Sequence, residues 1–214
     1  MATSNSAAVP GVPPAPGPLV SLDQPSEYKY DVFFSYKRDP QSDPWHREVK
    51  DILEGRLRFE LGGDVKIFID TDDIRTGDRW KSKIRKALGS SKTLICFWSP
   101  LYFTSQWCMA EWRTFAERER RYKAELLCPL RYCDGDNFPE ETKEWQILDV
   151  RKYTSPLPKF WDTADAVAFT QDLWKLAENL AIRIRNAPEF EQDFPIVEAE
   201  KIEIKPLPPI RCRI

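Results

Sequence analysis

The sequence has little of what most catalytic and metal sites require. Its 214 residues include one histidine, His46, and the cysteines are scattered with no CxxC pair. A zinc site needs several histidine or cysteine ligands, and a Ser-His or Cys-His nucleophile needs a histidine in reach. Core thiols therefore explain the cysteines best. Any chemistry is expected to use carboxylates, hydroxyls and backbone groups, without a metal.

The sequence also lacks an excess of one charge and a long apolar run. Lys and Arg number 32 against 34 Asp and Glu, and this near-neutral balance gives no footprint for bulk nucleic-acid or membrane binding. No run approaches the roughly 18 apolar residues of a spanning helix. The first residues lack the basic and apolar regions of a signal peptide. We expect a cytoplasmic protein that binds neither nucleic acid nor membrane.

Composition divides the chain into three parts. Residues 1–26 are rich in Pro, Ala, Ser and Gly with almost no charge, which predicts a disordered leader. Residues 27–187 have the length and apolar content of one folded domain. Residues 188–214 form a tail, whose KIEIKPLPPI stretch is a candidate edge strand.

Apolar runs and helical periodicities alternate along the folded part. Strands are expected over 28–36, 65–69, 92–98, 125–131 and 146–150. Helices are expected over 43–61, after Trp80, over 105–121 and across 169–184, with Asp43 as the first N-cap. This order predicts an α/β fold of the flavodoxin-like type, with a five-stranded parallel sheet and helices on both faces.

Three loops should meet at one edge of that sheet. The loops after the first three strands all leave the carboxyl ends, where open α/β sheets bind ligands. The first loop carries Lys37 and Arg38, the second is the acidic segment 70–80, and the third leads to Trp107 and Glu111. We expect these groups to converge.

Glu111 is the carboxylate that the sequence singles out. It falls on the second turn of a helix that Ser105 can cap, with Trp107 on the same face four residues earlier. Positions three and four residues away include no Lys or Arg, so the helix offers no ion pair. A glutamate of this kind is most often solvated or paired elsewhere. The surrounding pattern favours a functional role instead.

Three stretches together resemble the signature boxes of a TIR (Toll/interleukin-1 receptor) domain. They read YDVFFSYKRD, FIDTDDIRTGDRW and LICFWSPLYFTSQWCMAEW, and the resemblance covers about residues 28–185. The third is the most specific, through Ser99, Tyr102, Ser105, Trp107, Cys108 and Glu111. Trp112 departs from the pattern, which more often has leucine there. The chain also resembles stand-alone prokaryotic members.

The resemblance implies one of two functions. Some TIR domains are scaffolds that self-associate through the loop after the second strand, and others cleave NAD+. In the cleaving members the acid at the position of Glu111, within a WCxxE context, is catalytic. The resemblance thus implies an NAD+ glycohydrolase (NAD+ nucleosidase) that gives nicotinamide and ADP-ribose or a cyclised product. It would use no cofactor and act after self-association, in immune or stress signalling.

The resemblance also suggests substrate contacts. Trp80 or Trp107 could stack on a flat ring, and Lys37 or Arg38 could meet the pyrophosphate. Ser35, Tyr102 and Ser105 are further candidates. The plainer alternatives stay open: the indoles as core residues, the cations as solvated groups, and Ser105 as a helix cap.

Self-association is assigned to the second loop. The residues proposed for this contact are Asp72, Asp73, Arg75 and Gly77, with another copy, a sensor protein or a second TIR protein as the partner. A non-catalytic scaffold predicts that Glu111→Ala changes nothing, whereas Arg75→Ala or Gly77→Pro abolishes assembly. A nucleotide binder unrelated to TIR domains needs a glycine-rich loop after the first strand, and SYKRDPQS has no glycine.

Overall fold

Five parallel strands form the central sheet in a computed structural model that describes residues 27–70, 80–133 and 138–204. The strand order is β2-β1-β3-β4-β5. The strands are β1 (Tyr30–Ser35), β2 (Ile67–Ile69), β3 (Ser91–Trp98), β4 (Leu127–Arg131) and β5 (Leu148–Asp149). The two central strands, β1 and β3, are nearly continuous apolar runs because helices cover both faces. The predicted parallel sheet is confirmed.

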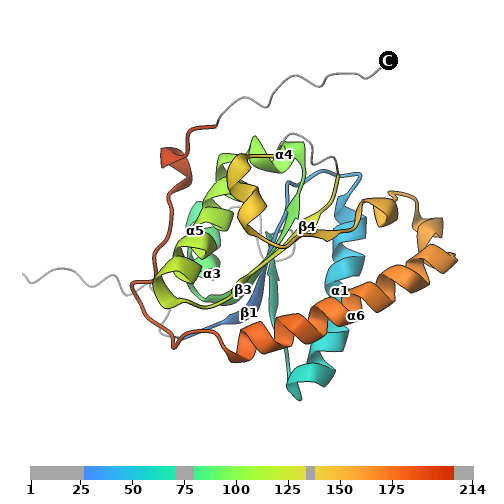
Figure 1. Ribbon diagram of the computed structural model, residues 1–214, viewed down its shortest axis with the longest axis horizontal. Coiled ribbons are helices and arrows are strands. Elements are labelled where there is room, and N and C mark those ends of the chain that lie inside the picture. The colour runs from blue at the N-terminus through green and yellow to red at the C-terminus, as the bar shows by residue number, and fades with distance from the viewer. Residues whose placement is uncertain (1–26, 71–79, 134–137, 205–214) are drawn as a thin grey trace, which may run out of the picture.

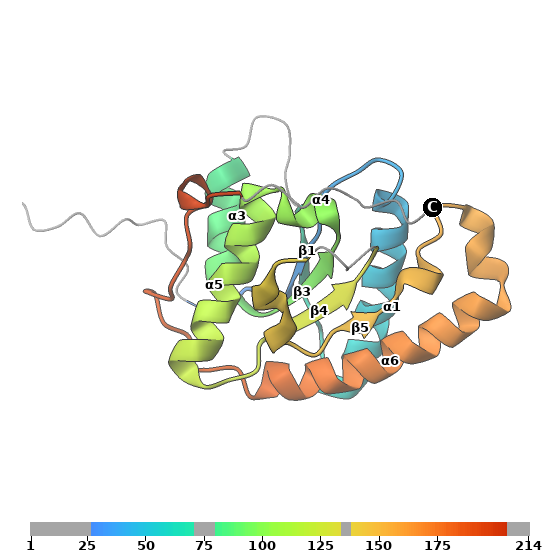
Figure 2. The same cartoon turned by 45° about the horizontal axis from the view of Figure 1, so that its top comes forward.

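Helices form a layer on each face of the sheet (Figures 1 and 2). One layer contains α1 (Asp43–Leu61) and α6 (Ala164–Arg185), and the other contains α3 (Trp80–Gly89) and α5 (Gln106–Tyr122). Shorter helices are α4 (Pro100–Phe103), η1 (Glu140–Glu144), η2 (Arg151–Tyr153), η3 (Pro158–Asp162) and η4 (Ala199–Lys201). Each layer buries its own apolar cluster against the sheet.

Several predicted boundaries are wrong by a few residues. Ser42, not Asp43, is the N-cap of α1, because the Asp43 carboxylate turns back to accept the backbone N–H of Asp39 at 3.2 Å. β5 is shorter than 146–150 because it pairs with only the last two residues of β4. The helix α4 was not predicted, although Ser99 caps it and Pro100 begins it.

The chain's one histidine lies on α1, and its side chain is buried in the core. The ring of His46 stacks on Tyr36 with centroids 4.0 Å apart and on Tyr132 at 5.0 Å. Its Nδ1 lies 2.9 Å from the carbonyl oxygen of Ser42. Burial lowers the pKa of His46 from 6.5 to about 3. The folded protein therefore holds this imidazole neutral.

His46→Phe should remove the part of the loss of stability at acidic pH that comes from protonation of His46. The unfolded chain protonates this histidine near pH 6.5 and the folded protein only near pH 3. The free energy of unfolding of the wild type should therefore fall through that window, by up to about 5 kcal/mol. Urea unfolding of both proteins at a series of pH values measures the difference. Parallel stability profiles for the two proteins would contradict this account.

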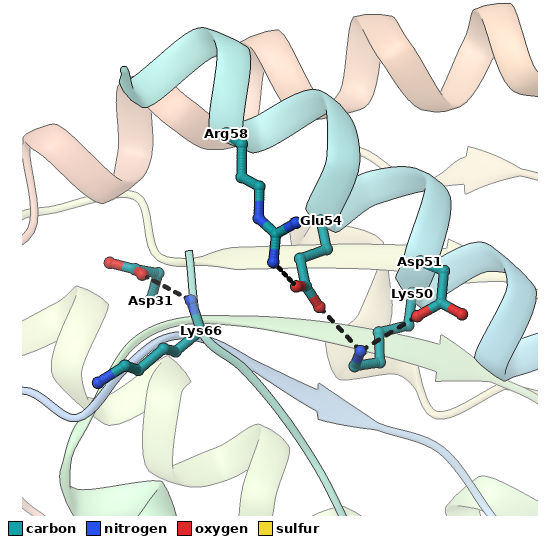
Figure 3. Close-up of polar contacts among 6 residues, drawn as sticks. All are labelled: Asp31, Lys50, Asp51, Glu54, Arg58 and Lys66. Atoms are coloured by element: carbon teal, nitrogen blue, oxygen red, sulfur yellow. Dashed lines mark hydrogen bonds and ion pairs between the residues drawn. The ribbon is translucent and has the colours of Figure 1, made fainter. Parts of the chain in front are cut away.

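Surface charges of α1 and β1 support local structure (Figure 3). The Glu54 carboxylate accepts from Lys50 at 2.8 Å and from Arg58 at 2.6 Å, both one turn away. Asp31 accepts the backbone N–H of Lys66 at 3.0 Å, just before β2. The Glu54 pairs support the helix by only tenths of a kcal/mol each, whereas the Asp31 contact joins the starts of two neighbouring strands.

The tail returns across the domain instead of adding to the sheet. Along residues 188–204 it runs antiparallel to α5, from an ion pair of Glu191 with Arg121 to a hydrogen bond of the Ile202 carbonyl with Gln106. No strand forms in this described part of the tail. The edge-strand prediction is therefore wrong there, because the apolar side chains of Phe194, Ala199 and Ile202 are buried in the domain.

Two contacts fix the first part of the tail. The phenyl ring of Phe194 lies 4.6 Å from the buried guanidinium of Arg118, which donates to the carbonyls of Leu88 and Ser91. At the other end of the domain's sequence, the hydroxyl of Tyr28 donates to the carbonyl of Pro188 at 2.9 Å. The beginning and the end of the domain therefore lie together beside the amino end of β1.

Candidate active site

Glu111 is a buried carboxylate on the sheet-facing side of α5. Ser105 caps this helix, as predicted, by accepting the backbone N–H of Cys108 at 3.4 Å. Glu111 follows on the second turn and is only 7% exposed. Its Oε2 accepts a hydrogen bond from the Ser35 hydroxyl at 2.6 Å. The carboxylate thus lies against the carboxyl end of β1.

A chain of hydroxyl groups holds this carboxylate. The Oγ of Ser35 is 2.9 Å from the hydroxyl oxygen of Tyr102. Ser35 has one hydroxyl proton, so when it donates to ionised Glu111 the tyrosine must donate to Ser35. The three side chains come from β1, α4 and α5, which meet at the carboxyl edge of the sheet. Glu111 is one of the groups predicted to converge at this edge, whereas Ser35 and Tyr102 were predicted only as substrate contacts.

The surroundings make ionisation of Glu111 costly. Burial raises the pKa of Glu111 to about 8, the Ser35 hydrogen bond opposes this, and the charge of Asp70 adds to it. Within the described residues, Glu111 forms no ion pair. The carboxyl group is therefore largely protonated at neutral pH until a cation approaches it.

Cationic groups lie on the loop that follows β1. Arg38 Nε is 3.3 Å from Asp70 Oδ1, at the start of the second loop. Burial raises the pKa of the Cys108 thiol, and the positive charge of Lys37 acts in the opposite direction. Lys37 is therefore within electrostatic range of the first turn of α5. Both cations are exposed, so they are open to an anion at this edge.

The two tryptophans predicted as stacking platforms lie together. The ring centroids of Trp80 and Trp107 are 4.8 Å apart, and Trp80 is 42% exposed. Lys81 and Arg85 each place their charge 5.9 Å from the Trp107 ring. The indole of Trp107 therefore packs towards α3, while Glu111 turns towards β1. The position of Lys81 and Arg85 beside the Trp107 ring was not predicted, although the two residues are four apart on α3 and so share a face.

Four of the predicted substrate-contact residues form two groups, whereas Lys37 and Arg38 lie on the loop after β1 and Ser105 caps α5. Ser35 and Tyr102 are buried behind Glu111, where they position its carboxylate; their contact with a substrate stays a prediction. Trp80 and Trp107 form the second group, called the rim, where α3 meets the start of α5. The proposed self-association residues Asp72, Asp73, Arg75 and Gly77 lie outside the described residues.

Two features are absent from the described ranges, residues 27–70, 80–133 and 138–204. No group of three or more His, Cys, Asp or Glu side chains there is arranged to hold a metal ion. Among the helices of the same ranges, none combines the length and the apolar content needed to cross a membrane.

Comparison with known proteins gives related sequences. A family model described as TIR domain matches residues 32–161. Toll-like receptor 4 of Pinctada imbricata is 24% identical over 160 residues, which are 72% of this chain and 16% of the receptor. The chain thus spans a small part of that relative. The resemblance to stand-alone prokaryotic members stays a prediction, because this relative is a receptor.

Two of the solved structures with similar domains come from a Toll-related receptor and a resistosome. The TIR domain of the Toll-related receptor TRR-2 from Hydra magnipapillata has a TM-score of 0.44 at 20% identity, covering 66% of this chain and 98% of that one. The TIR domains of the activated Roq1 resistosome, which directly recognises the pathogen effector XopQ, have a TM-score of 0.37 at 22% identity. The match covers 72% of this chain and 84% of that one.

Proposed function

The chain belongs to the TIR domain family, and we propose that it is an NAD+ glycohydrolase in which Glu111 is the catalytic residue. One observation carries the proposal: Glu111 is a buried carboxyl group with a raised pKa at the ligand-binding edge of the sheet. A buried acid held by one hydroxyl destabilises a fold, so such a group is characteristic of a functional site. The WCxxE context adds support.

The reaction suits a single carboxylate. The nicotinamide ring of NAD+ is cationic and leaves as a neutral molecule, so its departure needs no general acid. The ribose passes through an oxocarbenium-like state, which a carboxylate beside it stabilises more than the ground state. Water then adds to the anomeric carbon and releases a proton, giving ADP-ribose, or an internal nucleophile closes a ring.

The neighbouring residues have separate roles in this proposal. Ser35 and Tyr102 position the carboxylate of Glu111 through their hydrogen bonds. The exposed indole of Trp80 offers a stacking surface for a planar ring. Lys37, exposed on the loop after β1, is the proposed partner of a phosphate. The approach of the cationic nicotinamide would itself lower the pKa of Glu111 and favour its ionised form.

Self-association is part of the proposal. Because Glu111 is 7% exposed, the ribose reaches it only after the surrounding loops shift. We expect contacts between TIR domains to stabilise that shifted state, in a signalling response such as immunity. Cleavage should therefore increase with protein concentration more steeply than in direct proportion.

Nicotinamide release from NAD+ tests the activity. The purified 214-residue chain at high concentration, with and without a crowding agent, is compared with Glu111→Ala and with Glu117→Ala. Glu117 lies on the same helix and pairs with Arg120 at the surface, so its variant is the matched control. We expect wild type and Glu117→Ala to release nicotinamide and Glu111→Ala to release none. Intact NAD+ with folded, oligomeric wild type would overturn the proposal.

A scaffold role is the second candidate, favoured by the similarity to a Toll-like receptor. In that case the domain recruits another TIR protein through the loop after β2. Arg75→Ala should then abolish assembly, measured by light scattering, while Glu111→Ala assembles normally and NAD+ stays intact throughout.

A further inference from the structure

A carboxylate from the tail lies between two cations of α3. Glu200 accepts from Lys81 Nζ at 3.1 Å and from Arg85 Nη2 at 2.9 Å. The two cations are one helical turn apart, so their side chains lie on the same face. Lys81 is 52% exposed, Arg85 41% and Glu200 49%. An external anion could therefore reach the same two cations.

The tail places this carboxylate through its backbone. Glu200 lies in η4, between the buried side chains of Ala199 and Ile202. The side-chain amide of Gln106 donates to the Ile202 carbonyl at 3.0 Å, which ties η4 to the first residue of α5. In Figures 1 and 2, η4, coloured red, lies at the same end of the molecule as α4.

The same cations lie over aromatic rings. Lys81 Nζ is 5.8 Å from the Trp80 ring and 5.9 Å from the Trp107 ring, and Arg85 is also 5.9 Å from Trp107. Two cations beside a partly exposed indole suit a ligand with phosphate groups and a planar base. A carboxylate such as that of Glu200 offers two oxygens to these cations, as a phosphate group would.

We propose that Trp80, Lys81 and Arg85 form a nucleotide diphosphate site that Glu200 occupies in cis. A diphosphate displaces the Glu200 carboxylate, and the base stacks on Trp80. The consequence for catalysis rests on the proposed function: η4 then limits access of the NAD+ diphosphate to the rim near Glu111. The binding itself does not depend on NAD+ cleavage.

Calorimetric titration of the full chain with ADP and with inorganic pyrophosphate tests the site. Glu200→Ala should bind both probes about tenfold more tightly than wild type, because two exposed ion pairs no longer compete. Glu203→Ala is the control, since Glu203 is an exposed carboxylate of the same segment with no ion pair in the described part of the chain. Its affinities should equal those of wild type.

Further variants separate the parts of the site. In the Glu200→Ala background, Lys81→Ala with Arg85→Ala should abolish binding of both probes, and Trp80→Ala should weaken ADP alone. Equal affinities of Glu200→Ala and wild type, or retained binding without the two cations, would overturn the proposal. Glu111→Ala should bind ADP as wild type does. If the protein binds ADP but does not cleave NAD+, the proposed function is rejected while the proposal of a diphosphate site is retained.

Discussion

Glu111→Gln should slow nicotinamide release by at least about 100-fold, a loss of roughly 2.7 kcal/mol of transition-state stabilisation, while making the folded protein more stable at alkaline pH. Glutamine keeps the size of the side chain and can still accept from Ser35, whose hydroxyl is 2.6 Å from the carboxylate. It cannot supply a negative charge to the oxocarbenium-like state. The two effects therefore have opposite signs.

The stability effect follows from the pKa of Glu111. The folded-state value is raised from 4.5 to about 8, so the stability that the protonated acid provides is complete below pH 4.5 and is lost as the pH rises through 8. Above this window the wild type carries a penalty of up to about 5 kcal/mol that glutamine avoids.

Urea unfolding measures this difference. At about pH 5 the free energies of unfolding of wild type and Glu111→Gln should be close, and at about pH 9 the variant should be more stable. Glu117→Gln, on the exposed side of the same helix, should follow the wild type in both stability and activity. Equal stability of Glu111→Gln and wild type at both pH values would show that ionised Glu111 is not destabilised by its site.

Trp112→Ala should lower the free energy of unfolding by about 3 to 5 kcal/mol, the range for truncating a buried large aromatic side chain. Trp112 is fully buried and contacts the rings of Trp98 and Trp145, each with centroids 5.4 Å away, and of Phe103 at 5.9 Å. The departure from the leucine typical of the family is thus accommodated by an aromatic cluster.

Denaturant unfolding with near-ultraviolet circular dichroism checks this effect. Trp174→Ala on α6 is the matched control, because Trp174 is 45% exposed and its ring contact is with Arg56. We expect the control to lose less than about 1 kcal/mol. A comparable loss for both variants would mean that the aromatic cluster around Trp112 stabilises the fold no more than an exposed tryptophan does.

The sequence predicted the features that depend on local patterns. Apolar runs located all five strands, and Ser105 correctly located the start of the helix that carries Glu111. The hydrogen bond between Ser35 and Glu111 could not be predicted from local sequence, because the two residues are 76 positions apart. The pairing of β1 with β3 brings them together. Ser35 had been predicted as a substrate contact, and the structure gives it a position behind the acid.

The tail was predicted poorly for a related reason. Alternating residues such as those around Ile202 fit an edge strand and also fit a segment that packs across a helix. The choice depends on which apolar surface is left uncovered, and α5 offers one that the local sequence does not reveal. Glu200 was likewise missed, because its partners Lys81 and Arg85 lie 119 and 115 residues away.

The hydrogen bond between Tyr28 and Pro188 fixes where the described domain begins. The described chain enters at Glu27, beside the amino end of the sheet, and its last described residue, Ile204, follows η4 at the opposite end. The first described residue therefore lies at the amino edge of the sheet, opposite the edge where Glu111 meets Ser35. The last described residue follows Ile202, whose carbonyl accepts from Gln106 at the start of α5, so the two ends of the described domain lie at opposite edges of the sheet.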